Sequence, residues 1–309
     1  MEIHNGAITL ETIQLPNKSL SALLQPRNGI LPHVRELRVS CDDSQIGESC
    51  SQDAETFVQL VVAALPRNCL KSFNSFLAVS SRFVLHLLQC HRKLESLFII
   101  VGDSPHGTSL LKLDTASNAL WLSPCLQNIE RLATFITPGR MEQFYDSRFL
   151  IRNAPQLKEL IVATHGKQLA QVHLSPDGTD DLFNAESQES TSSERRVLDL
   201  LGLCGLDFSA RTSSLLSFIN ASALQSLQLS QCKNIGPLLI ALAAEFKHSC
   251  SLVEFDITLI DAPTLELSRP LTEPWMSWAP ICGVSGFSPR QEATLTLIMS
   301  LDMDPPCDN

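Results

Sequence analysis

The chain has 309 residues, of which 44% are hydrophobic and 18% are charged, and its formal net charge is −10. This composition is typical of a globular protein with a substantial core, and the acidic balance, which no basic patch offsets, argues against nucleic acid or a membrane as a partner. The longest apolar runs are shorter than the roughly 18 residues that a membrane-spanning helix needs. The first residues, MEIHNGAITLETIQL, lack the basic and apolar regions of a signal peptide. We therefore expect a cytoplasmic or nuclear protein.

A Leu-x-x-Leu-x-Leu ladder recurs along the chain, at intervals of 24 to 41 residues. In chain order, the nine copies, two of them degraded, are Leu10/Ile13/Leu15, Val34/Leu37/Val39, Leu70/Phe73/Ser75, Leu94/Leu97/Ile99, Ile129/Leu132/Thr134, Leu157/Leu160/Val162, Leu198/Leu201/Leu203, Leu224/Leu227/Leu229 and Leu252/Phe255/Ile257. The last two positions of each ladder are two residues apart, so they point to the same face of an extended chain. Each ladder therefore predicts a short strand.

Helical patterns separate most of the ladders. The first apolar stripe, which Asp53 would cap and Pro66 would end, consists of Phe57, Leu60, Val61, Ala64 and Leu65. Three later stripes are Met141/Phe144/Tyr145/Phe149, Leu215/Phe218/Ile219 and Leu239/Leu242/Ala243/Phe246, and Gly236-Pro237 opens the last. One strand and one helix cannot bury their faces alone, so such segments stack. We predict an α/β fold, a leucine-rich-repeat solenoid with a curved parallel sheet on the concave face and helices on the convex face.

The predicted solenoid covers residues 1–260. An acidic, turn-rich stretch at 175–195 accounts for the longest interval and is predicted to be a loop insertion, either merely tolerated or regulated by phosphorylation. A smaller loop is predicted at Cys41–Asp53. Residues 261–309 are expected to form a C-terminal cap, with Trp275 and Trp278 over the last open core, or else a loosely ordered tail.

The ten cysteines are spread singly from Cys41 to Cys307 and include no Cys-x-x-Cys pair. This spacing is typical neither of a metal site nor of a compact disulfide framework. We therefore expect reduced, mostly structural thiols, no metal and no cofactor. Cys232 follows a ladder at the bend where the strand turns away, and its thiol should pack inside and donate a weak hydrogen bond.

Two runs near the end of the array carry a family resemblance. The run LQSLQLSQCKNIG, followed by LIALAAEFKHSCSLVEFDI, resembles the cysteine-containing repeats of F-box/LRR proteins, with Cys232 after one ladder and Cys250 before the next. LLQCHRKLESLFI, with Cys90, repeats the second half of this pattern, and HVRELRV at His33–Val39 is similar to repeats of fungal F-box-like proteins. The resemblance covers residues 10–257. It implies the substrate-recognition arm of a cullin-type ubiquitin ligase, whose repeats bind the protein to be marked.

The F-box itself, a helical module that grips a Skp-type adaptor, is not recognisable, and the first ladder already begins at Leu10. Two interpretations therefore stay open. In the first, the chain is an amino-terminally incomplete ligase adaptor, whose partners include a Skp-type adaptor and a cullin. In the second, it is a repeat-only binding scaffold unrelated to ubiquitination.

Residues between and just after the ladder positions should project onto the concave face. Toward the two ends of the array they are polar, namely Thr12, Gln14, Glu36, Arg38, Ser226, Gln228, Glu254 and Asp256. In the middle they are mostly apolar, namely Phe98, Ile100, Ala133, Phe135, Ile161, Ala163, Leu200 and Cys204. Contiguous exposed apolar area usually marks a binding site. We predict that Phe98, Ile100, Phe135, Ile161, Leu200 and Cys204 bind the protein partner. The alternatives are a shifted register, with Phe135 inward and Thr134 outward, or a loop that covers the patch.

An enzyme is the rival class of protein. The nearest approach to a catalytic motif is VGDSPHG, which crowds Asp103, Ser104 and His106 into one loop, whereas hydrolases assemble such groups from distant segments. The stretch from Ala163 to Lys167 lacks the first glycine of a phosphate-binding loop. We expect no catalytic residues and no enzymatic activity.

Overall fold

The computed structural model describes residues 2–4, 7–11, 31–40, 48–102, 113, 116–136, 141–164, 174–184, 195–209, 213–247, 249–258 and 294–297. The chain divides into two compact units, Met1–Lys167 and Gln168–Asn309. Both are α/β structures built on parallel strands that helices connect. Among the helices of the described part, none is both long and apolar enough to cross a membrane.

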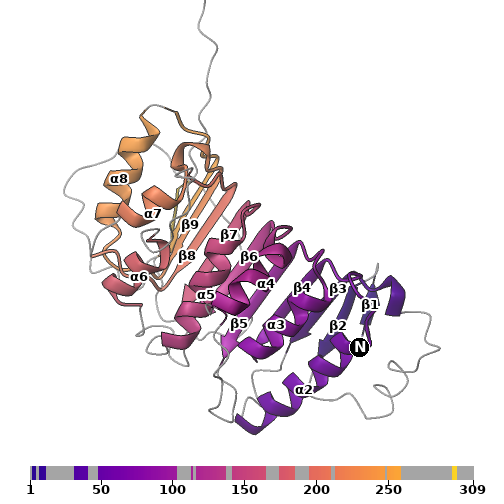
Figure 1. The fold of residues 1–309 in the computed structure, drawn as a ribbon. Helices are drawn as coiled ribbons and strands as arrows, with labels where there is room; N and C mark the ends of the chain where they lie inside the picture. The colour runs from indigo at the N-terminus through magenta and orange to yellow at the C-terminus, as the bar shows by residue number, and fades with distance from the viewer. Residues whose placement is uncertain are drawn as a thin grey trace, which may run out of the picture. The chain divides into compact units, whose positions relative to one another are not determined.

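In the first unit the strands lie side by side in the order in which the chain makes them. They are β1 (Glu2–His4), β2 (Ala7–Glu11), β3 (Glu36–Ser40), β4 (Ser72–Ser80), β5 (Ser96–Gly102), β6 (Arg131–Ile136) and β7 (Glu159–Thr164). The first pair is antiparallel and every later pair is parallel. Connections of this kind require crossovers. They contain η1 (Leu31–His33), α2 (Glu48–Ala64), α3 (Ser81–Cys90), α4 (Ala116–Leu126) and α5 (Met141–Asn153), and the α-helices cover one face of the sheet (Figure 1).

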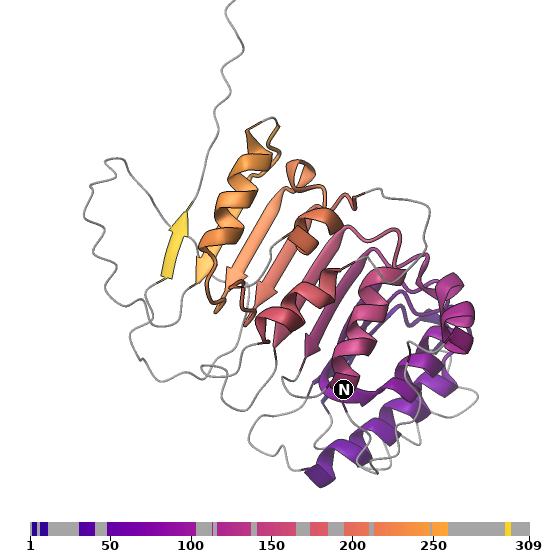
Figure 2. The same cartoon turned by 60° about the vertical axis from the view of Figure 1, so that its left-hand side comes forward.

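The second unit repeats this design on a smaller scale (Figure 2). Its strands β8 (Leu200–Cys204), β9 (Ser226–Ser230) and β10 (Glu254–Thr258) are parallel, and β11 (Thr294–Leu297) pairs with β10 in the antiparallel sense. Its helices are α6 (Pro176–Phe183), α7 (Ser213–Phe218), η3 (Ala221–Ala223) and α8 (Gly236–Phe246). The expected opening of α8 by Gly236-Pro237 is confirmed.

The ladders predicted from the sequence line up strand against strand. In the first unit the fourth ladder positions form one row across β3 to β7, namely Leu37, Phe73, Leu97, Leu132 and Leu160. In the second unit Leu201, Leu227 and Phe255 form an equivalent row. All of these except Phe255 are at most 2% exposed. The strand predictions for eight of the nine ladders are therefore confirmed.

The prediction for the first ladder is wrong. Ile8 and Leu10 pair with Leu37 and Val39, so they take the places predicted for Ile13 and Leu15. Ile8/Leu10 and Ile13/Leu15 have the same two-residue alternation, so the pattern alone does not distinguish them. The pairing of β2 with β1 and β3 shows that Ile8 and Leu10 are the strand residues. Thr12 and Gln14 lie outside the described residues.

Main-chain hydrogen bonds connect one helix–turn–strand segment to the next. The N–H of the residue before each strand donates to the carbonyl oxygen of the equivalent residue in the preceding segment. These bonds join Lys71 to Arg35 (2.7 Å), Glu95 to Lys71 (2.8 Å), Glu130 to Glu95 (2.9 Å) and Lys158 to Glu130 (2.8 Å). In the second unit Gln225 donates to Asp199 and Val253 to Gln225 in the same way. These bonds hold consecutive strands in a common register.

Helix α2 begins earlier and is rotated relative to the prediction. It starts at Glu48, so residues 48–53 of the predicted Cys41–Asp53 loop are helical and Asp53 is not the cap. Among its described side chains Val58, Val61 and Val62 are buried, as is Leu65 directly after the helix, whereas Leu60 is 51% exposed. Glu55 accepts hydrogen bonds from the backbone N–H (3.2 Å) and the hydroxyl (2.5 Å) of Ser80, and it shares a helix face with Val58 and Val62. In this rotated position of α2, Glu55 contacts the start of α3.

The other helical predictions hold in part. Leu215, Phe218 and Ile219 are buried as expected, and so are Phe144 and Phe149 of α5. In α8 the buried residues are Leu238 and Leu242, while Ala243 is exposed, so the predicted stripe lies one position away from the observed one. The expected loop at 175–195 is wrong for its first part, where α6 forms with Ser175 as its N-cap and Pro176 in its first turn.

Two polar groups lie deep in the core of the first unit. Asp146 of α5 is 1% exposed and accepts hydrogen bonds from the Ser81 hydroxyl and from the N–H of Leu113 (2.7 Å). His91, which directly follows α3, is fully buried, and within the described part of the chain neither of its ring nitrogens has a hydrogen-bond partner. Burial lowers the pKa of His91 from 6.5 to about 4, which the nearby backbone of Val62 only partly offsets.

Candidate partner-binding face

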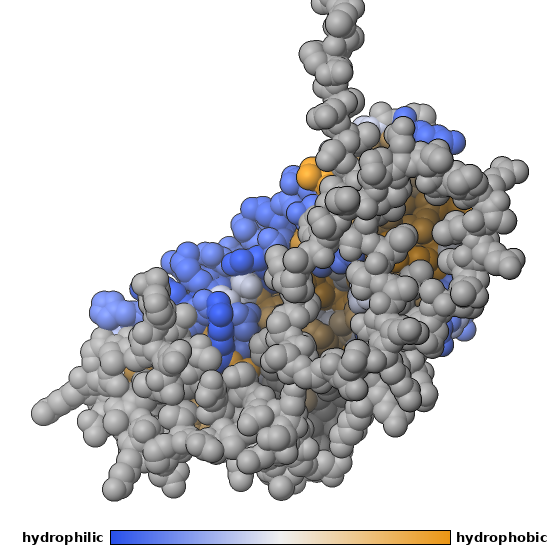
Figure 3. All heavy atoms as spheres, turned by 180° about the vertical axis from the view of Figure 1, so that it is seen from behind, coloured by the Kyte–Doolittle hydropathy of each residue, from blue (hydrophilic) through white to orange (hydrophobic). Residues whose placement is uncertain are grey.

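The side chains that alternate with the ladder residues of β3 to β7 form a face that the helices do not cover. We call it the open face, and its residues are Glu36, Arg38, Ser72, Asn74, Ser96, Phe98, Ile100, Arg131, Ala133, Phe135, Glu159, Ile161 and Ala163. Seen from the side opposite to the helices, the surface shows hydrophobic areas next to hydrophilic ones (Figure 3). The open face is thus divided by chemistry.

Its apolar part lies on β5, β6 and β7. Strand pairing places Phe98, Ala133 and Ile161 in one row and Ile100, Phe135 and Ala163 in the next. We call these six residues the platform. The structure therefore brings together four of the six predicted binding residues, Phe98, Ile100, Phe135 and Ile161.

Two aromatic rings dominate the platform. The ring centroids of Phe98 and Phe135 are 5.0 Å apart and the rings are tilted by 57°, a favourable geometry for an aromatic pair. Both residues are half-buried, whereas Ile100, Ala133 and Ala163 are each 6% exposed. The expectation that Ile100 is exposed is therefore wrong; it lies between Ala78 of β4 and Phe135 of β6 in the strand pairing.

Strand β6 has the register that the sequence predicts. Thr134 is fully buried and its hydroxyl lies 2.7 Å from that of Ser147, while Phe135 is on the open face. The alternative in which Phe135 points inward is therefore wrong. The loop after β5, which includes Asp103, Ser104 and His106, lies outside the described residues.

The remaining two predicted residues belong to the second unit. Leu200 and Cys204 lie at the two ends of β8, opposite Ser226 and Ser230 of β9, and both are half-buried. The predicted set is thus divided between the units, with four residues in the first and two in the second.

A hollow of about 370 Å³ borders the platform. Its lining consists of Glu36, Arg38, Ser72, Asn74, Ser96, Leu97, Phe98, Arg131, Leu132, Ala133, Glu159 and Ile161. Small side chains at Ser72, Ser96 and Ala133 between longer neighbours account for the depression. The ladder pattern does not predict it, because that pattern gives the direction of a side chain and not the volume that it leaves empty.

One ion pair lies in the lining of the hollow, and two more lie near it at the start of the strands. Glu36 accepts from Arg38 (2.6 Å) and from Asn74 (3.1 Å). At the start of the strands, Lys71 pairs with Glu95 (2.7 Å) and Lys158 with Glu130 (3.1 Å). These ion pairs are exposed to solvent, so each contributes less than about 1 kcal/mol to stability. Their effect on recognition is to leave little uncompensated charge on this side of the molecule.

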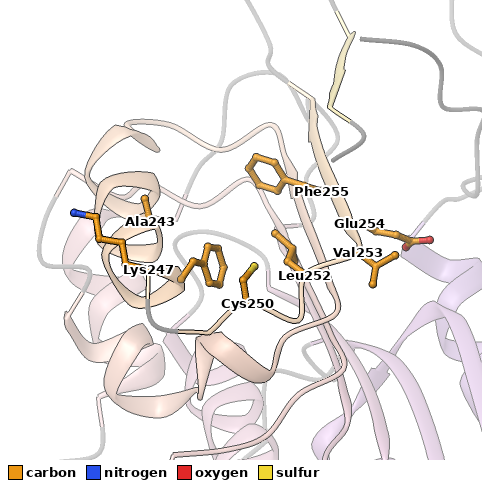
Figure 4. Close-up of a pocket in the computed structure, with 8 residues that line it drawn as sticks. Ala243, Lys247, Cys250, Leu252, Val253, Glu254 and Phe255 are labelled. Carbon is orange, nitrogen blue, oxygen red and sulfur yellow. The ribbon is translucent and has the colours of Figure 1, made fainter. Parts of the chain in front are cut away.

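A second pocket, of about 320 Å³, lies in the second unit between α8 and β10. Around it stand Cys250, Leu252 and Phe255, while the charged ends of Lys247 and Glu254 point away (Figure 4). The pocket can hold an apolar side chain but offers no convergent polar groups for chemistry. Trp275 and Trp278, expected to cap the array, lie outside the described residues.

Cys232 is a structural thiol, as predicted. It is 8% exposed, and its sulfur donates to the carbonyls of Leu203 (3.3 Å) and Ser230 (3.4 Å). Burial raises the pKa of Cys232 to about 12, so the nucleophilic thiolate is scarce at neutral pH. The sulfur thus connects β9 to β8.

The described residues contain no group of three or more histidine, cysteine or acidic side chains that would hold a metal ion. In comparisons with known proteins, no family model matches the chain and no curated protein matches it.

Proposed function

We propose that this chain is a leucine-rich-repeat solenoid that recognises another protein through the open face. The observation that carries the proposal is the platform, where half-buried Phe98, Phe135 and Ile161 reach the surface from three adjacent strands, on the side of the sheet without helices (Figure 1). Contiguous apolar surface of this kind is typical of interaction sites.

Three features support the solenoid. The strands of each unit are laid down in chain order, the turns before them are joined by recurrent main-chain hydrogen bonds, and the ladder positions of β3 to β9 are buried. Repeat proteins stack similar segments in this way, so that each contacts its neighbours. The buried Cys232 at the bend after β9 adds the feature on which the sequence resemblance is based.

The partner is a protein, and the F-box/LRR resemblance favours a substrate of a cullin-type ubiquitin ligase in the cytoplasm or nucleus. In that case the natural partners also include a Skp-type adaptor and a cullin. A repeat-only scaffold uses the same open face without them. No enzymatic activity, cofactor, nucleic acid or membrane belongs to this proposal.

Differential affinity capture tests the role of the open face. The chain is tagged at its carboxyl terminus and expressed in its own cells as wild type, Phe98→Asp and Ile161→Asp. Leu60→Asp is the matched control, because Leu60 is an exposed apolar residue on α2, away from the open face. Mass spectrometry should find proteins captured by wild type and Leu60→Asp and lost with both open-face variants, while all four thermal unfolding curves stay similar.

Equal capture by all four proteins would refute the role of the open face. Unfolding of Phe98→Asp and Ile161→Asp would show instead that these side chains belong to the core. The same samples discriminate the two binding interpretations: a Skp-type adaptor and a cullin among the captured proteins support the ligase arm, and their absence beside a specific partner supports the scaffold.

A further inference from the structure

We infer that the second unit binds the guanidinium group of an arginine from a protein partner, on the side of β9 and β10 opposite to the ladder residues. The inference goes beyond the proposed function, since it concerns other strands and a different chemistry from those of the platform. Its basis is an acidic surface on which two buried oxygen atoms have no hydrogen-bond partner.

Four polar side chains form this surface. Strand pairing places Ser226 beside Glu254 and Gln228 beside Asp256, and we call these four residues the acceptor site. Adjacent strands are about 4.8 Å apart and alternate residues of one strand about 7 Å, so the four side chains start from the corners of a small rectangle. Phe255, between the two acids, lines the pocket beside α8, whereas Glu254 points away from that pocket (Figure 4).

Two oxygen atoms of the acceptor site are buried without a partner. Ser226 is 7% exposed, and its Oγ makes no hydrogen bond within the described part of the chain. The same holds for the buried Oδ1 of Asp256, and burial raises the pKa of this carboxyl group. A buried polar atom without a partner costs free energy, and a charged one costs more. A ligand that donates hydrogen bonds to these oxygens would remove that cost.

The chain itself does not neutralise the two acids of the acceptor site. The basic residues in the described part of the second unit are occupied or lie elsewhere: Arg195 pairs with Glu245 (2.9 Å), the Arg196 guanidinium lies over the ring of Phe218, Lys233 interacts with Asp207, and Lys247 lies across the pocket from Glu254 (Figure 4). By contrast, the open face of the first unit combines two acidic residues with two basic ones. The acceptor site is therefore complementary to a cation.

A guanidinium suits the acceptor site better than an ammonium or a metal ion. It carries five N–H donors in one plane and is less strongly hydrated than an ammonium, so it can serve several fixed oxygens at once. A metal ion would need a group of three or more histidine, cysteine or acidic side chains, and the described residues contain none. The net charge of −10 also attracts a basic partner over longer distances.

Titration with short peptides tests the inference and requires no identified partner. The full chain, labelled with ¹⁵N, is titrated with the peptide acetyl-Gly-Gly-Arg-Gly-Gly-amide at about 50 mM salt, where charges are little screened, and amide NMR signals report binding. Peptides with lysine or with uncharged citrulline in place of the arginine are compared. Asp256→Asn keeps the shape of the side chain and removes its charge. Asp177→Asn is the matched control, because Asp177 is exposed on α6.

The arginine peptide should shift signals of β9 and β10 in wild type and Asp177→Asn, and it should bind Asp256→Asn at least about tenfold more weakly, because a charge-assisted hydrogen bond is lost. The lysine peptide should bind more weakly than the arginine peptide, and the citrulline peptide should not bind. Unchanged signals of β9 and β10, or equal affinity for wild type and Asp256→Asn, would overturn the inference. Equal binding of the lysine or citrulline peptide would overturn the choice of arginine.

Urea unfolding at pH 7 separates ligand binding from a structural role of Asp256. Since its buried Oδ1 has no partner to lose in the free chain, Asp256→Asn should be at least as stable as wild type. A clear loss of stability would show that Asp256 holds the fold, and the inference would fall. Either failure leaves the proposed function standing, because Phe98→Asp and Ile161→Asp test only the platform.

Discussion

Acidification should destabilise the first unit through His91. This residue starts the turn whose last residue, Leu94, donates to the His91 carbonyl (3.1 Å). The turns before β3, β6 and β7 start with Leu31, Leu126 and Ala154, all buried, while the turn before β4 starts with exposed Pro66. An imidazole therefore occupies a position that is apolar in its neighbours. Because the neutral form is favoured there, the folded state binds a proton less readily than the unfolded state.

The sign and size of the effect follow from the pKa of His91 in the folded and unfolded states. The folded pKa is about 4 and the ordinary value is 6.5, so stability is highest above pH 6.5 and falls as the pH drops from 6.5 toward 4. One pKa unit corresponds to about 1.4 kcal/mol, which gives a loss from His91 of at most about 2 kcal/mol by pH 5 and about 3 kcal/mol by pH 4.

Urea unfolding at pH 8, 6, 5 and 4, followed by circular dichroism, measures this contribution in wild type and His91→Leu. The substitution installs the side chain found at Leu31 and Leu126. Carboxylates titrate equally in both proteins. As the pH falls, His91→Leu should therefore lose less unfolding free energy than wild type. His33→Leu, at an exposed position, is the control. Parallel pH profiles for wild type and His91→Leu would refute the reasoning.

Three further predictions concern the core and the open face. Leu97→Ala should cost about 2 to 5 kcal/mol of unfolding free energy, because Leu97 is 1% exposed, whereas half-buried Phe98→Ala should cost clearly less; similar losses in urea titrations would contradict the assignment of the two faces. Asp146→Ala should cost at least about 2 kcal/mol, because its buried donors lose their acceptor, and unchanged thermal unfolding would disprove that role. Iodoacetamide at pH 8 should label half-buried Cys90 and spare Cys232 in the native protein; mass spectrometry showing equal labelling would exclude the buried thiol.

The sequence predicts the strands well because their signal is local. A ladder such as Leu94/Leu97/Ile99 contains its own alternation, and the direction of Phe98 follows from its place between Leu97 and Ile99. The same logic correctly places Phe135 opposite Ile100 although the ladder at Ile129 is degraded. Four members of the proposed site can therefore be identified from the sequence without their contacts.

The failures have a different physical origin. The apolar run around Val58 admits two helical stripes, and packing against the sheet and the Glu55–Ser80 contact are what distinguish Val58 from Leu60. The polar composition around Ser175 conceals α6, whose buried Leu182 and Phe183 pack in the second unit. In each case the deciding neighbour is distant in the chain.

The sequence alone thus determined where the strands β3 to β10 lie, which way their side chains face and that helices separate them, because periodicities of two and 3.6 residues are properties of short segments. Only the tertiary structure decided the rotation of α2, the burial of His91, the contact between the rings of Phe98 and Phe135, and the hollow beside them. These features depend on the volume and position of side chains from several strands and helices at once, and no local pattern encodes them.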